Sequence, residues 1–306
     1  MMSPPDVIRI ANAPCSWGVL EFEAHDATGY DYSRVLDEMR AAGYSGTELG
    51  DWGFMPTDPE ALVEALDARS LTLTGAFVPV RLTDPSAIVA GEAAALRTAH
   101  LLTASGFPEA FVVLADEVSG SLARAAVAGR VGPDDRLGEA DRALVARHAE
   151  RIARAVRETT GTRTVLHHHC ATYIETAEEV HDVMRRTDPD VLGLCLDTGH
   201  LTYAGGDPAH AVVEFGERIW HLHLKDCDPG VAARARREGW SYHVAVRHGV
   251  FCELGRGSVR FDRVLDALTA YGFRGWGVVE QDVLPSLGTP AASAARNRAY
   301  LRSLGL

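Results

Sequence analysis

The stretch RTVLHHHCATYIETAEEVHDVMRRTDPDVLGLCLD, residues 163–197, holds one complete unit of the pattern that decides the fold. A short apolar run is followed by a segment with helical spacing of apolar residues and then by a second apolar run, VLGLCLD. Thr176 and Glu179 form a capping-box pattern near the start of the helical segment. This order predicts a βαβ unit with two parallel strands.

The same alternation runs along the whole chain. Strands are expected at residues 7–12, 46–50, 71–77, 110–115, 163–169, 191–197, 219–226 and 276–281. Helical spacing is clearest at residues 32–43, 58–70, 175–187 and 259–272, and Gly43 is a plausible C-cap of the first of these. Eight such units without a break in composition predict an α/β fold, a single (β/α)8 TIM barrel over residues 1–306.

Two features of organisation refine this prediction. A doubly wound open sheet is the alternative fold, but no GxGxxG follows the first strand, which weakens its dinucleotide-binding form. Residues 227–257 form a long excursion after the seventh strand. We interpret this excursion as an insertion that helps to cover the active site.

Charge and composition narrow the class of protein. The chain has 306 residues and a net charge of -12, which argues against nucleic-acid binding and favours a small-molecule partner. Its start lacks the pattern of a signal peptide, and no apolar segment is long enough to span a membrane, so we expect a cytoplasmic protein. The five cysteines form no CxxC pair, so no disulfide framework or thiolate zinc site is indicated. A homo-oligomer is compatible with the sequence.

Ionisable residues gather where the expected strands end, and these ends meet at one mouth of a parallel barrel. The residues are Glu48, His167, His169, Asp197, His221, His223, Lys225 and Glu280. Side chains alternate along a strand, so His167 and His169 share a face while His168 points away from them. We therefore expect His168, and likewise His181 in the following helix, to be structural.

Acids and imidazoles from several strands are what a divalent cation requires. We expect the ligands to be His167, Asp197, His223 and Glu280, with Mn²⁺, Co²⁺, Mg²⁺, Fe²⁺ or Zn²⁺ as candidate ions. His169, His200 and His221 would orient these ligands, face substrate or handle protons. Structural alternatives stay open: Asp197 is also a helix-cap candidate, His221 also suits a core position, and Glu48 suits either role.

The segments VLHHHCATYIETAEEVHDVMRRTDPDVLGLCLDTGHLTYAGGDP, ERIWHLHLKD and YGFRGWGVVEQD resemble the xylose isomerase-like TIM-barrel superfamily of sugar isomerases and epimerases. Within it the likeness is strongest to the inosose dehydratase branch, and it includes APCSWG and GYSGTELG near the N-terminus. The resemblance implies a divalent metal, most often Mn²⁺ or Co²⁺, held by Asp197, His223 and Glu280, with His200 facing substrate. Most of the superfamily has a Glu on the fifth strand where His167 stands here, and His169 is the alternative ligand.

The resemblance implies a hydro-lyase that dehydrates a keto-inositol through a metal-stabilised enediolate. Glu280 or Glu48 would accept the proton and His169 or His200 would donate one, with Lys225 beside them as a further catalytic residue. A sugar or sugar-phosphate isomerase or epimerase is the alternative, and a sugar-binding barrel without turnover is a third hypothesis. Arg256 and Trp17 are candidates for lining the pocket, with a surface salt bridge and core packing as equally good explanations.

Overall fold

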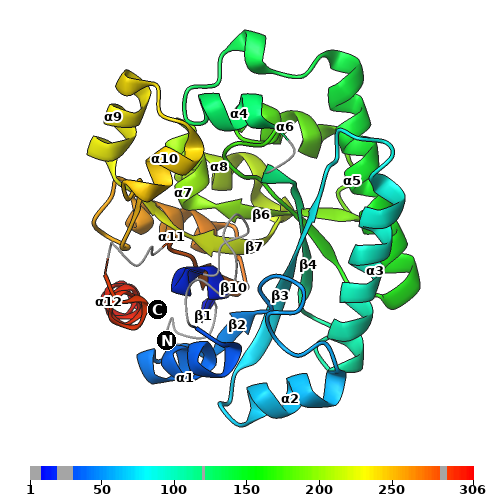
Figure 1. The fold of residues 1–306 in the computed structure, drawn as a ribbon, viewed down its shortest axis with the longest axis vertical. Coiled ribbons are helices and arrows are strands. Elements are labelled where there is room, and N and C mark those ends of the chain that lie inside the picture. The colour runs from blue at the N-terminus through cyan, green and yellow to red at the C-terminus, as the bar shows by residue number, and fades with distance from the viewer. Residues whose placement is uncertain (1–7, 19–29, 119–120, 283–287) are drawn as a thin grey trace.

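The computed structural model describes residues 8–18, 30–118, 121–282 and 288–306, and its centre is a closed barrel of parallel strands (Figure 1). The barrel strands are β1 Ile8–Asn12, β2 Gly46–Glu48, β3 Thr72–Val80, β4 Phe111–Asp116, β5 Thr164–His167, β6 Leu192–Asp197, β7 Ile219–Leu224 and β10 Gly275–Val279. β1 pairs with β10 in parallel and so closes the ring. The predicted TIM barrel is confirmed, and the open doubly wound sheet is excluded.

Helices surround the barrel. They are α1 Tyr32–Ala42, α2 Pro59–Asp67, α3 Ile88–Ala104, α4 Leu122–Val127, α5 Glu139–Thr160, α6 Ala177–Arg186, α7 Thr198–Tyr203, α8 Pro208–Phe215, α9 Pro229–Glu238, α10 Tyr242–Arg247, α11 Phe261–Ala270 and α12 Pro290–Ser303. The capping box of Thr176 and Glu179 forms at the start of α6, and Gly43 ends α1 with a φ of 91°. No helix among the described residues is both long and apolar enough to cross a membrane.

Most expected strands differ from the observed ones by one to three residues at an end, and two of these differences bear on the site. The strand expected at 163–169 stops at His167, because the chain turns and the backbone N–H of His169 bonds to the carbonyl of Ile174. The strand expected at 219–226 stops at Leu224, and Asp226–Cys227 pairs as β8 in an antiparallel ribbon with β9, Phe251–Cys252. Val7, expected to begin the first strand, lies outside the described residues.

Apolar residues pack on both faces of the barrel wall. Leucines of β6 and β7 pack outward against the helices in the main core, as Leu194 and Leu222 do. The lumen is filled by a smaller cluster that includes Phe111, Val113 and Val165. At the base of the lumen Trp220 lies so close to Gly193 that a Cβ there would come within 2.2 Å of the indole. The indole therefore fills the lumen at this level, and the carboxyl ends of the strands lie beyond it.

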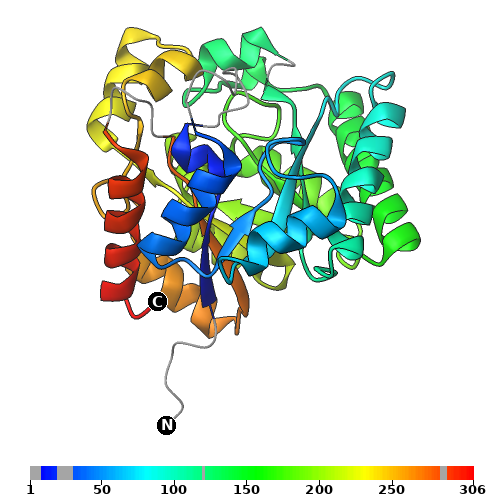
Figure 2. The same ribbon diagram turned by 60° about the horizontal axis from the view of Figure 1, so that its bottom comes forward.

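The segment between β7 and α11 stands over this upper end. It contains β8, α9, α10 and β9, and α10 contacts α4, which follows β4. Figure 2 shows α4 in green beside α9 and α10 in yellow, at the end of the barrel toward which the strands run. Residues 227–257 thus lie over the mouth where the ionisable residues were expected.

Candidate metal centre

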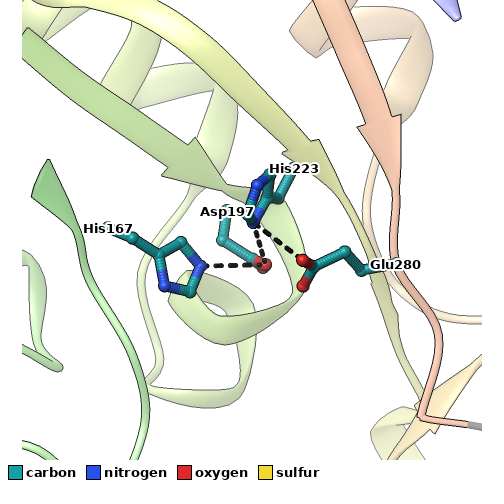
Figure 3. A group of neighbouring side chains, drawn as sticks. All are labelled: His167, Asp197, His223 and Glu280. Atoms are coloured by element: carbon teal, nitrogen blue, oxygen red, sulfur yellow. Dashed lines mark ion pairs between the residues drawn. The ribbon is translucent and has the colours of Figure 1, made fainter. Parts of the chain in front are cut away.

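Four side chains from four neighbouring strands meet in the upper lumen (Figure 3). His167 is the last residue of β5 and Asp197 the last of β6, while His223 lies in β7 opposite Asp197, and Glu280 follows β10. One donor atom from each of the four lies within 4.8 Å of the others, and all four residues are buried. We call these residues the four-donor centre. The structure therefore brings together the set expected from the sequence.

Several donor atoms of the four-donor centre face one another but form no hydrogen bonds with each other. His167 Nε2 is 3.6 Å and His223 Nδ1 3.9 Å from Asp197 Oδ2, and His223 Nδ1 is 3.2 Å from Glu280 Oε1. Asp197 Oδ2, His167 Nε2 and His223 Nδ1 are buried and have no hydrogen bond among the described residues. Buried polar atoms normally have partners, and a cation at their common focus would serve all of them. The donor set therefore fits a divalent ion.

Asp197 is held so that only one oxygen faces the centre. Its Oδ1 accepts the backbone N–H of His200 at 2.7 Å and caps α7, and its own backbone N–H donates to His168 Nε2 at 3.0 Å. Burial alone would raise the pKa of this carboxyl, but the charge of Lys225 and the neighbouring imidazoles outweigh burial and hold the pKa well below its usual range. Asp197 is therefore both a helix cap and an ionised donor.

His223 is oriented from behind by a carboxylate. Its Nε2 is 3.0 Å from Glu48 Oε1, which also lies 2.7 Å from His221 Nε2. Burial alone would raise the pKa of Glu48, but these two imidazoles lower it well below normal, so the carboxylate accepts and His223 Nε2 carries the proton. Once the ring has lost its second proton, His223 would present the Nδ1 lone pair to a cation at the centre. The arrangement matches the carboxylate and histidine pairs that orient metal ligands.

Lys225 places a buried positive charge beside the same carboxylates. Its Nζ is 2.9 Å from Glu280 Oε2 and 3.9 Å from both Asp197 Oδ2 and Asp282 Oδ1, and it lies 3.1 Å from His200 Nε2. Burial alone would lower the pKa of this lysine, but the three acids raise it well above its ordinary value. Lys225 is therefore charged and faces the cavity with the four-donor centre.

The three consecutive histidines have three different surroundings. His167 belongs to the four-donor centre, whereas His168 points away, bonds to the backbone of Asp197 and has its pKa lowered by burial to about 3. His169 lies past the end of the strand, where its Nδ1 donates to the carbonyl of Cys170 at 2.6 Å. The structure thus gives His168 a structural contact and places His167, not His169, next to Asp197. His181 lies on the exposed face of α6 and pairs with Glu214.

A cavity of about 80 Å³ opens above these residues, and we call it the barrel cavity. It is lined by Ala13, Pro14, Cys15, Glu48, Gly50, Asp51, Phe77, His167, His169, Lys225, Tyr242, Glu280 and Asp282. Trp17 is buried and donates to Glu38 at 2.6 Å, and Arg256 is an exposed partner of Glu253. Neither is among the described residues that line the cavity. Trp17 therefore belongs to the core, and Arg256 forms a surface salt bridge.

Sequence reasoning missed several of the lining residues. Asp282 lies two residues after Glu280, past the end of β10, and its place beside a strand-end carboxylate was the only signal for it in the sequence. Tyr242 had no such signal: it comes from α10, and its hydroxyl lies 3.4 Å from His169 Nε2. Phe77, whose ring meets that of His167 edge to face, reads in the sequence as ordinary strand packing.

Cation binding at this centre should strengthen as the pH rises. Burial alone would lower the pKa of His223, but negative charges around it, including Glu280 and Glu48, raise the pKa well above normal. A cation needs the neutral ring, so binding releases a proton, and affinity should rise about tenfold per pH unit below that pKa. Titrating Co²⁺ between pH 6 and 8 measures how the affinity depends on pH. Repeating the titration in buffers of different ionisation enthalpy measures the number of protons released. Glu48→Gln should reduce the proton release, and an unchanged release would contradict this account.

Comparisons with known proteins indicate the same fold and the same family. A family model described as xylose isomerase-like TIM barrel matches residues 36–304. An inosose dehydratase of Geobacillus thermodenitrificans is 32% identical over 271 residues, 89% of each chain, and a rhizopine catabolism protein of Rhizobium meliloti is 34% identical over 85% of this chain and 78% of that one. A 3-keto-D-glucoside 4-epimerase from E. coli has a TM-score of 0.69 at 17% identity, covering 97% of this chain and 99% of that one. These matches confirm the resemblance expected from the sequence.

Proposed function

This chain belongs to the xylose isomerase-like TIM-barrel family, and we propose that within it the chain is a divalent-metal-dependent hydro-lyase that dehydrates a keto-inositol. The relatives named inosose dehydratase, about 30% identical over most of the chain, support this reaction class. The observation that carries the proposal is the four-donor centre, whose buried atoms converge without satisfying one another.

The residues that would hold the ion are His167, Asp197, His223 and Glu280. A divalent cation supplies Lewis-acid polarisation of a ketone, which makes the neighbouring C–H bond acidic. Two imidazoles suit a borderline ion such as Co²⁺ and two carboxylates suit a harder ion such as Mn²⁺, so these two are the leading candidates, with Fe²⁺, Zn²⁺ and Mg²⁺ as alternatives. The protein then has to accept a proton, stabilise the negative charge that develops on the substrate and protonate the leaving hydroxyl.

His169 is placed to accept and return the proton. Because its Nδ1–H donates to the carbonyl of Cys170, its Nε2 carries the lone pair, and burial lowers its pKa so that the ring is neutral. Nε2 can accept the proton from the carbon beside the ketone. The imidazolium then donates it to the departing hydroxyl, which leaves as water. Glu48 is the less favoured acceptor, because its Oε1 is already bonded to His221 and His223.

Lys225 and Glu280 have electrostatic roles in this scheme. The buried ammonium of Lys225 faces the cavity and would stabilise negative charge that develops on the substrate oxygen. Glu280 holds Lys225 at 2.9 Å and contributes to the four-donor centre, so we assign it to binding rather than to proton transfer. His200, 3.1 Å from Lys225, would orient the ammonium; it is buried and is not among the described residues that line the barrel cavity, so the expected contact with substrate is not part of this scheme.

Incubation of the Mn²⁺- or Co²⁺-loaded protein with 2-keto-myo-inositol tests the proposal. We expect release of water and growth of the ultraviolet absorbance of the dione product, and protein stripped with a chelator serves as the control. No turnover of 2-keto-myo-inositol together with rapid epimerisation of ketohexoses would replace the proposal with the epimerase alternative. Binding of the keto-inositol without any turnover would favour a non-catalytic barrel.

A further inference from the structure

A second cavity of about 470 Å³ lies at the rim of the barrel, and we call it the rim cavity. It is lined by Asp51, Trp52, Phe77, Val78, Pro79, Ala94, Arg97, Thr98, Glu117, Val118, Leu122, Ala125 and His243. Its volume is within the roughly 300–1,000 Å³ that is typical of small-molecule sites, whereas the barrel cavity is well below it. The larger space is therefore beside the four-donor centre rather than directly above it.

The two cavities share their walls. Asp51 and Phe77 line both of them. On α10 the consecutive residues Tyr242 and His243 line the barrel cavity and the rim cavity, respectively. Phe77 meets the ring of His167 edge to face, with the ring centroids 6.3 Å apart, so this one side chain lies between the four-donor centre and the rim cavity. A ligand held at the four-donor centre would reach the rim cavity by passing Phe77.

The lining of the rim cavity suits a sugar-like ring. Trp52 is 37% exposed, and the guanidinium of Arg97 lies 4.3 Å from the centre of its ring. Val118, Leu122 and Ala125 add apolar surface, while Glu117, which pairs with Arg81 at 3.3 Å, adds a carboxylate. Arg97 covers one face of the Trp52 ring, and the rest of the indole can pack against the C–H face of a second ring, while the guanidinium and the carboxylates bond to its hydroxyls. A phosphate is disfavoured, because Asp51 and Glu117 would repel it.

We propose that the rim cavity binds a second ring joined through oxygen to the keto-polyol, so that the preferred substrate is a glycosylated keto-inositol rather than the free one. This inference rests on the proposed function, since the first ring must lie at the four-donor centre. Trp52 packs against the second ring, and Phe77 separates the two positions. Substrate preference is then set by the loop after β2, by Phe77 of β3 and by α10, which all reach both cavities.

Direct binding tests this inference without relying on turnover. Titration calorimetry would compare myo-inositol with an O-glucosyl-myo-inositol on the metal-loaded protein, and we expect the glucosylated compound to bind at least about tenfold more tightly. Trp52→Ala should remove this advantage without changing the affinity for myo-inositol, and Trp52→Phe should keep most of it. Tyr271→Ala, which removes an exposed aromatic ring outside both cavities, is the matched control and should have no effect.

The outcomes separate the two proposals. Equal affinities for the two compounds, or an equal loss for both in Trp52→Ala, would overturn the rim cavity as a second-ring site, even if 2-keto-myo-inositol is dehydrated. Tighter binding of the glucosylated compound that depends on Trp52 would support the rim cavity, even if dehydration fails and the proposed reaction has to be abandoned.

Discussion

Replacing Asp197 with Asn is expected to lower the turnover of 2-keto-myo-inositol by about 10³-fold and to weaken divalent-cation binding by at least about 10²-fold. The substitution removes the charge that faces the centre, because Oδ2 is the atom 3.6 Å from His167 and 3.9 Å from His223. It keeps the other function of this side chain. Asn caps helices about as well as Asp, so the bond from the backbone N–H of His200 can persist at the start of α7.

Melting temperatures measured with and without metal distinguish loss of ion binding from loss of the folded structure. The metal-free variant should have a melting temperature within a few degrees of the metal-free parent protein, and only the parent should gain stability when Co²⁺ or Mn²⁺ is added. Asp207→Asn is the matched control, since Asp207 caps α8 from an exposed position and accepts from the N–H of Ala209 at 2.9 Å. Normal turnover by Asp197→Asn, or an equal loss in Asp207→Asn, would contradict the role given to Asp197.

Strand periodicity predicted the barrel and most of its mouth. Apolar runs such as VLGLCLD identify strands, and parallel strands in a ring bring residues as distant in the chain as His167 and Glu280 to one place. Alternation along β5 was enough to separate His168 from His167. Local pattern succeeded here because the site is built from strand ends, whose relative positions follow from the closed sheet.

Contacts made by loops and insertions could not be read in the same way. Tyr242 reaches His169 from α10, and the rim cavity depends on how α10 and α4 lie over the strands. No periodicity encodes such placements, since they depend on packing between segments far apart in the chain. The double contact of Glu48 with His221 and His223 was also hidden, because it depends on which strands face each other across the lumen.

The donor set of the four-donor centre has consequences for the choice of ion. It combines two imidazoles with two carboxylates, and the ammonium of Lys225 lies 2.9 Å from Glu280 and 3.9 Å from Asp197. Nitrogen donors favour borderline ions, and the affinity of such sites rises from Mn²⁺ to Co²⁺. The nearby ammonium further weakens the attraction for a hard ion that depends on carboxylate charge. This chain should therefore bind Co²⁺ more tightly than Mn²⁺.

Replacing His167 with Glu should shift this preference toward Mn²⁺. The variant offers three carboxylates and one imidazole, so we expect the ratio of Co²⁺ to Mn²⁺ affinity to fall by at least about tenfold, with Mg²⁺ binding strengthened. Competition titrations against a chelating indicator measure the ratio. The visible absorption of bound Co²⁺ reports the change of donors independently of activity.

Two further variants make the His167 result specific. His167→Gln, which removes the imidazole without adding charge, should weaken both ions and leave Mg²⁺ binding no stronger. His169→Gln should leave the ratio unchanged, because His169 is turned toward Cys170 and Tyr242 and lies outside the four-donor centre. A ratio that responds to His169→Gln and not to His167→Glu would show that the ligand from this part of the chain is the histidine two residues further on, and the centre would have to be redrawn around it.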